Sequence, residues 1–196
     1  GAFTSTTIDA TALTGNLPAL NASSLTSIPA ANITGTLPAI SGANLTGLTS
    51  SQMPAGSILQ VVAYSTTSSA DTSSTSWTAT GFSASITPST TSSKVFIIAT
   101  FNAETWGAEG AIGTYTLYHD QTTNLGDASY GMGMQSGTNS TAPNYHSRAI
   151  GTLTYVHSPG SVAEADYEIY QKNQGPAGGT KVGPGRTSIT LMEIAG

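Results

Sequence analysis

The sequence predicts an all-β protein in two parts, a repetitive β shaft in residues 1–54 and a β-sandwich head in residues 55–196. Three observations lead to this prediction. The first 52 residues repeat with a period of 20, the later residues form short segments of alternating apolar and polar side chains, and no segment has a sustained helical period.

The shaft is defined by large aliphatic residues whose spacing runs 5-4-3-5-3 and then repeats. Pro18, Pro29 and Pro38 each directly follow one of these residues, and proline disrupts a helix interior because it lacks the amide donor. The repeat therefore predicts short extended pieces joined by turns. The predicted shaft core consists of Ile8, Leu13, Leu17, Leu20, Leu25, Ile28, Ile33, Leu37, Ile40, Leu45 and Leu48.

A ribbon with one aliphatic stripe has no second layer that buries the stripe. Self-association solves this problem, so the repeat predicts an intertwined homotrimer resembling a triple β-spiral, with the stripes on a shared axis. The alternative is a disordered linker rich in Ser and Thr. Such linkers do not normally keep an aliphatic register over two full periods, which favours the trimeric shaft.

The composition is typical of an extracellular fibre. Charged residues make up 8% of the chain, against about a quarter in ordinary soluble domains, and Asp9 and Asp71 are the only ones before Lys94. The net charge of -5 gives no basic face for nucleic acid. The longest apolar run, Val95–Ala99, is far too short to span a bilayer, so we expect no membrane insertion. There is no cysteine for disulfides or thiolate metal sites.

The head is predicted to contain seven or eight strands separated by loops rich in Gly, Ser, Pro and Asn, which suits a sandwich of the jelly-roll type. Lys94–Phe101 is apolar on both faces, as expected for a central strand that is packed on both sides. The glycine-rich segment Gly175–Gly185 is predicted to be a long surface loop. The other expected strands are 58–64, 82–86, 114–119, 148–156, 166–170 and 189–194.

Residues suited to catalysis are few, and we expect neither an enzyme nor a bound cofactor or metal. Glu164, Asp166 and Glu168 share one face of a predicted strand, where they form either a cation or glycan-hydrolase site or simply a solvated face. Strand alternation alone predicts the solvated face, which we prefer. The three histidines lack the spacing of metal ligands: His119, His146 and His157.

Two predicted loops, 102–113 and 127–148, combine aromatic with polar residues, as protein surfaces that bind glycans do. Aromatic rings stack on the apolar faces of sugars, while carboxylates and amides bind their hydroxyls. Trp106 is also compatible with packing at a trimer interface or capping the sandwich, and Trp77 is expected in the core. The receptor-binding candidates are Glu104, Trp106, Tyr130, Asn144, Tyr145 and His146.

Two segments carry a resemblance to a known class of proteins. The run LPAISGANLTGLTSSQMPAGSILQVV, residues 37–62, resembles the distal part of tail-fibre proteins from tailed bacteriophages, especially marine and cyanobacterial ones. The closing TSITLMEIAG, residues 187–196, resembles the end of the same proteins. The resemblance implies an extracellular virion protein, a homotrimeric tail fibre joined to other tail proteins, whose C-terminal head attaches to a host glycan or surface protein.

Two alternatives remain open at this stage. One is a structural virion protein, such as a head fibre or capsid decoration protein, that binds no receptor. The other is a trimeric adhesin on a bacterial or spore surface.

Overall fold

The computed structural model describes residues 49–107, 109–137, 145–175, 178–183 and 185–196. The chain separates into two units, Gly1–Leu45 and Thr46–Gly196, and the described residues all belong to the second. The eleven predicted shaft-core residues, Ile8 to Leu48, lie outside the described residues. The trimeric shaft therefore stays a prediction.

The prediction of an all-β fold is confirmed. The described residues form two antiparallel sheets and one short 3₁₀ helix, η5 (Ser50–Gln52), with no α-helix. Sheet A contains β1 (Ile58–Thr66), β11 (Thr187–Ile194), β4 (Lys94–Gly107), β8 (Tyr145–His157), β10 (Gly178–Val182) and β2 (Ala70–Thr72). Sheet B contains β3 (Thr78–Ile86), β9 (Ala165–Asn173), β5 (Ile112–His119), β6 (Thr123–Asn124) and β7 (Met134–Gly137).

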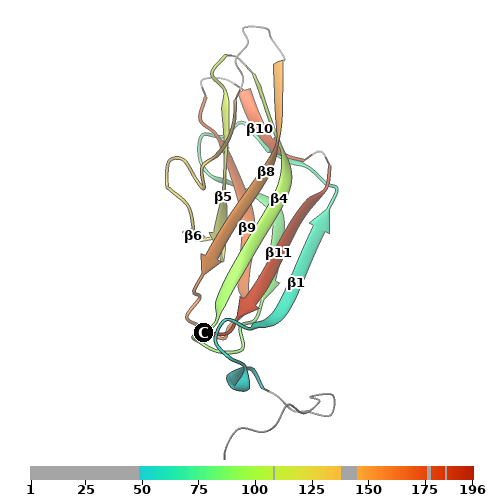
Figure 1. Cartoon of the computed structure of the whole chain (residues 1–196). Helices are drawn as coiled ribbons and strands as arrows, with labels where there is room; N and C mark the ends of the chain where they lie inside the picture. Colours follow the sequence, from blue (N-terminus) through green and yellow to red (C-terminus); the bar gives the residue numbers. More distant parts are fainter. Residues whose placement is uncertain (1–48, 108, 138–144, 176–177, 184) are drawn as a thin grey trace, which may run out of the picture. The chain divides into compact units, whose positions relative to one another are not determined.

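The long strand β4 lies at the centre of sheet A. Strand β8 pairs with one edge of β4 along almost its whole length, from Val95 opposite His157 to Gly107 opposite Tyr145. Its other edge is shared between β11, which pairs with residues 94–100, and β10, which pairs with residues 103–107. Strands β8, β4, β11 and β1 consequently lie side by side (Figure 1).

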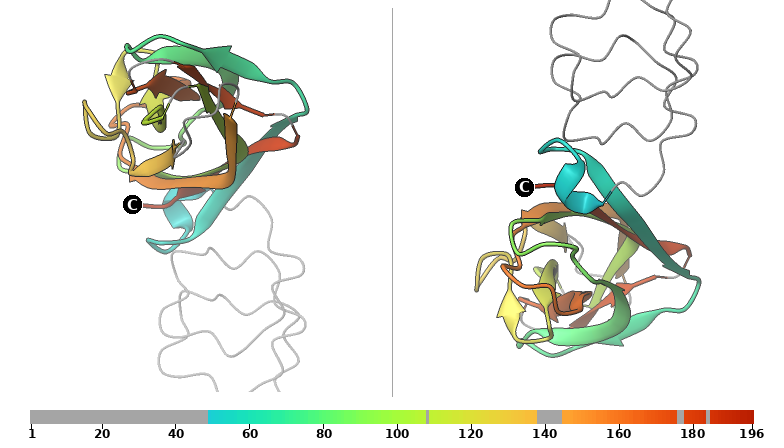
Figure 2. Two further views of the ribbon diagram at one scale, coloured as in Figure 1. Left: turned by 90° about the horizontal axis from the view of Figure 1, so that it is seen from above. Right: turned by 90° about the horizontal axis from the view of Figure 1, so that it is seen from below.

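Sheet B has the order β3-β9-β5, and both β6 and β7 pair with β5. Seen end-on, the two sheets curl toward each other (Figure 2). The C-terminus lies beside η5 and the start of β1, where the amide of Gly56 donates to the carbonyl of Ala195 at 2.8 Å.

The hydrophobic core lies between the sheets and follows the predicted alternation. In β4, Val95, Ile97 and Phe101 face inward and are at most 1% exposed, whereas Phe96 and Ile98 face outward and are half-buried. The described residues therefore cover the apolar β4 segment on one face only. Burial of each large apolar side chain contributes about 1.5–3 kcal/mol. The other large apolar core residues are Phe82, Ile86, Tyr115, Leu117, Leu153, Tyr167, Ile169, Val182, Ile189 and Leu191.

The prediction of a surface loop at Gly175–Gly185 is wrong, because this segment contains β10. Thr180 faces the core, where its hydroxyl lies 2.5 Å from that of Tyr115. Gly178 has a φ of 136°, a conformation that favours glycine. Glycine is typical of loops, but here it is required because β10 lies close to β4. The segment therefore lacks the alternation of apolar and polar residues that indicates a strand.

Two further expectations about side chains are corrected. Trp77 lies half-buried outside the core cluster, with its indole N–H donating to the carbonyl of Ala128 at 2.9 Å and the Lys172 ammonium 4.5 Å from its ring centroid. Glu168 is 4% exposed rather than solvated, and it accepts a 2.6 Å hydrogen bond from the amide of Gly81. Burial raises the pKa of Glu168. Asp166 is half-buried, and only Glu164 of the three predicted surface carboxylates is exposed.

A second buried carboxylate, Glu193 of β11, joins three parts of the head. It accepts hydrogen bonds from the Gln60 amide at 2.7 Å, the Ser93 hydroxyl at 2.7 Å and the Ser89 amide at 2.6 Å. Burial by itself raises the pKa of Glu193, but these hydrogen bonds outweigh it and hold the pKa below its ordinary value. The charged carboxylate therefore fastens the segment between β3 and β4 to β1 and β11.

We expect Glu193→Gln to lower the free energy of unfolding at neutral pH by about 1–3 kcal/mol, because the amide cannot accept all of these hydrogen bonds. The folded state lowers the pKa of Glu193, so this stabilisation is present above the ordinary pKa of 4.5 and is lost as the pH falls through the lowered value. Thermal unfolding between pH 7 and pH 3 measures both effects. Glu164→Gln, at an exposed carboxylate, is the control and should leave the melting midpoint unchanged.

Candidate functional site

The structure brings together three of the six candidate receptor-binding residues, on paired strands rather than on loops. Glu104 and Trp106 belong to β4, and His146 belongs to β8 directly opposite Trp106. Arg148 lies opposite Glu104. The loop prediction was wrong for these residues because β8 and β10 supply hydrogen-bond partners that extend β4 beyond its apolar run to Gly107.

Glu104 is the electrostatic centre of this cluster. Its side chain is 5% exposed, and its oxygens lie 2.5 Å from His146 Nδ1 and 3.3 Å from Arg148 Nε. Burial by itself raises the pKa of Glu104, but the hydrogen bonds and charges of Arg148 and His146 outweigh it and lower the pKa below its ordinary value. Arg148 is thus anchored by a buried carboxylate while 69% of its side chain stays exposed to solvent.

Trp106 supplies an aromatic surface next to this ion pair. Its ring is stacked on that of His146, with centroids 6.4 Å apart and planes inclined by 26°. The ammonium of Lys181 in β10 lies 5.6 Å from the indole centroid. Gly179, opposite Trp106 in β10, leaves room for the indole, because a β-carbon at residue 179 would collide with the ring.

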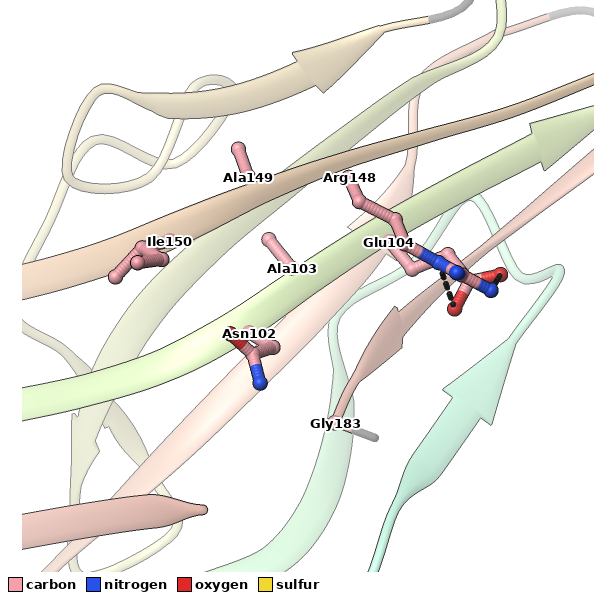
Figure 3. A pocket seen from close by; sticks show the side chains of 7 residues that line it. All are labelled: Asn102, Ala103, Glu104, Arg148, Ala149, Ile150 and Gly183. Atoms are coloured by element: carbon pink, nitrogen blue, oxygen red, sulfur yellow. Dashed lines mark hydrogen bonds and ion pairs between the residues drawn. The ribbon is translucent and has the colours of Figure 1, made fainter. Parts of the chain in front are cut away.

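A hollow of ≈ 390 Å³ lies beside the ion pair on the outer face of sheet A. Figure 3 shows Glu104 and Arg148 joined at one end and Asn102 and Ile150 at the other. Ile150 is 74% exposed, so the hollow combines an apolar wall with charged and amide groups. Its lining consists of Asn102, Ala103, Glu104, Arg148, Ala149, Ile150 and Gly183.

We call Asn102, Glu104, Trp106, His146, Arg148, Ile150 and Lys181 the Glu104 patch. The patch lies toward the end of sheet A at which Gly107 pairs with Tyr145. The chain enters β1 at Ile58, which pairs with Ile194 at the opposite end of the sheet. The Glu104 patch is therefore remote from the place where the preceding residues join the head.

The remaining candidates do not join the patch in the described structure. Tyr130 is 60% exposed on the turn from Asp127 to Gly131, beside sheet B. The carboxylate of Asp127 accepts a hydrogen bond of 2.7 Å from the backbone amide of Tyr130. Asn144 and the side chain of Tyr145 lie outside the described residues.

Sequence reasoning missed Arg148, Lys181 and Gly179 as members of this region. Arg148 was predicted within a strand, and Lys181 and Gly179 within a loop. One signal was available: His146, Arg148 and Ile150 are spaced two apart and therefore share a strand face. Nothing in the local sequence indicates that β10 lies beside β4.

No model of a known protein family matches the chain, and a search of curated protein sequences finds no significant match. The described residues contain no group of three or more His, Cys, Asp or Glu side chains placed to hold a metal ion. No helix in this part of the chain is long and apolar enough to cross a membrane.

We expect Gly179→Ala to displace the Trp106 indole, because the new methyl group would occupy the same space. Overpacking of this kind costs about 1–3 kcal/mol of stability. Fluorescence in a Trp77→Phe background, where Trp106 is the single emitter, should show a shifted emission maximum. Gly137→Ala is the matched control, since its β-carbon would meet its nearest neighbour at 3.7 Å. Unchanged emission from Gly179→Ala would contradict the close packing of β10 on Trp106.

Proposed function

We propose that this chain is the distal part of a virion tail fibre: a trimeric shaft presents the head, and the Glu104 patch binds a glycan on the host-cell surface. The observation that carries the proposal is the patch itself, an aromatic ring beside an anchored guanidinium, at the end of sheet A opposite to Ile58, where the chain enters β1.

The strand order also supports the jelly-roll form of this proposal. The four long strands of sheet A follow the order β1-β11-β4-β8, and β3, β9, β5 and β7 succeed one another in sheet B. All the pairs are antiparallel, as in a pair of interleaved Greek keys.

The chemistry of the patch suits a sugar ring. Trp106 offers an apolar face on which the C–H groups of a pyranose can stack, and Ile150 supplies a separate apolar group on the other side of the Glu104–Arg148 pair. Arg148 uses Nε and Nη2 to bind Glu104, and its exposed guanidinium presents further N–H donors toward ligand oxygens. Glu104 is too buried to serve as the main ligand contact; its role is to hold Arg148 and His146 in position.

A trimer would present three such sites on one particle. When several patches of one trimer bind at the same time, the overall affinity exceeds that of a single patch, although each patch makes the same interactions. Weak binding by each patch therefore suffices for attachment.

We expect Trp106→Ala to weaken glycan binding at each site by roughly tenfold to a hundredfold, because the stacking surface is removed. The purified full chain is titrated on a panel of immobilised bacterial-surface glycans and on intact cells. Tyr130→Ala is the matched aromatic control and should bind like the unmodified protein, since Tyr130 lies beside sheet B. Equal binding by Trp106→Ala and the unmodified protein would remove the patch from the proposal.

We expect the full chain to sediment as a homotrimer in dilute buffer, because the aliphatic stripe of residues 8–48 needs partners. Sedimentation velocity and equilibrium measure this directly. A stable monomer would contradict the fibre. Immunogold labelling of particles then distinguishes a tail fibre from a capsid decoration protein, which would be labelled on heads.

A further inference from the structure

The outer face of sheet A near the start of β1 carries aligned apolar side chains that no other layer of the described residues covers. Strand pairing places Val61 opposite Met192, Met192 opposite Phe96, and Phe96 opposite Val156, so these four side chains form one row across the sheet. Neighbouring rows contribute Ile58, Ile194 and Ile98. We call these seven residues the apolar face.

Three side chains of the apolar face are about half exposed in the described part of the chain. Ile58 is 57% exposed, Val61 56% and Val156 49%. Lys94, which pairs with Ile194, is the only charged residue within these rows. A contiguous apolar surface with so little charge is typical of a face that another protein surface covers.

The edge of the sheet beside this face is also open. Within the described part of the chain, β8 pairs with β4 alone, which leaves the other edge of a 13-residue strand without a β partner. This strand contains no proline and one residue that is always charged, Arg148. The strand therefore has few of the prolines and charges that usually prevent an exposed edge from pairing with other strands. Contact with another chain would cover this edge.

The aliphatic spacing of the sequence indicates which protein covers the face. After Leu48, the next large apolar residues that remain exposed are Met53 and Ile58, each five residues further on. Met53 keeps the 5-4-3-5-3 register of the predicted shaft, which ends there, and the apolar face begins five residues later at Ile58. Chains held together by the shaft repeat would meet again at this face, at a high effective concentration.

We propose that the apolar face, with the part of the β8 edge beside it, packs against other copies of this chain and forms the contact between heads. The inference rests on the trimer of the proposed function and assigns the surface that the heads use. The apolar rows end where Ser65, Ser188, Thr100 and Thr152 align across the sheet. The Glu104 patch begins with the next outward residue of β4, Asn102. The proposed contact between heads therefore ends where the patch begins.

A matched pair of valines tests the assignment. Val156 is 49% exposed on the apolar face, and Val162 is 53% exposed in the loop after β8. In a free subunit, either residue tolerates a charge. We expect Val156→Glu to lower the melting midpoint of the full chain by about 5 °C or more, because a carboxylate would be buried between heads. Val162→Glu should leave the midpoint unchanged, and equal midpoints for both variants would overturn the assignment.

Cysteine labelling provides a second measurement that does not depend on destabilisation. The chain has no cysteine, so Thr154→Cys on the outer face of β8 and Thr75→Cys in the loop after β2 each introduce one thiol. Both threonines are exposed in the single chain. We expect a maleimide to label the cysteine at 154 at least about tenfold more slowly than the one at 75, with equal rates after unfolding.

Sedimentation of the same samples separates the two proposals. A trimer whose two thiols react equally fast would overturn the contact between heads but leave the trimeric fibre in place. A monomer would overturn both. A trimer with selective protection of the thiol at 154 supports both.

Discussion

Backbone hydrogen bonding along β4 is the constraint on which the rest of the head depends. This strand of 14 residues has two edges of amides and carbonyls that need partners inside a sheet. One neighbour, β8, satisfies the first edge almost completely. The second edge passes from β11 to β10 between Thr100 and Ala103, and this change of partner brings Gly179 and Lys181 beside Trp106 and Glu104. The Glu104 patch thus results from the way in which β4 is paired.

Alternation of apolar and polar residues predicted most of the fold, because inward and outward positions of a strand differ in solvent contact. It located β3 and β11 and their core side chains Phe82 and Leu191. It could not locate β10, because this strand of five residues contains two glycines and a single core apolar residue, Val182, and its place depends on a distant partner. For the site, residue chemistry selected Glu104, Trp106 and His146, but only the pairing of β4 with β8 showed that Arg148 joins them.

Charged residues are scarce in the head, and three of them have a specific structural place. Glu104, Glu168 and Glu193 are all at most 4% exposed, and each accepts at least one hydrogen bond within the chain. These carboxylates hold strands together and are not exposed to solvent. Hydroxyl and amide groups therefore make most of the hydrogen bonds with water at the surface. The same scarcity leaves the apolar face without charges that would repel a second copy, apart from Lys94 at its end.

The place of β11 in sheet A has a consequence for synthesis on the ribosome. Strand β11 lies between β1 and β4, which pair with it and not with each other. Sheet A therefore stays divided until residues 187–194 have been translated, although β1 emerges long before them. Insertion of β11 completes the hydrogen bonds between the strands at the centre of sheet A. It also brings Glu193 to its hydrogen-bond partners Ser89, Ser93 and Gln60. A prematurely terminated chain would lack this strand and leave the sheet open. The head can therefore be completed only after translation through β11.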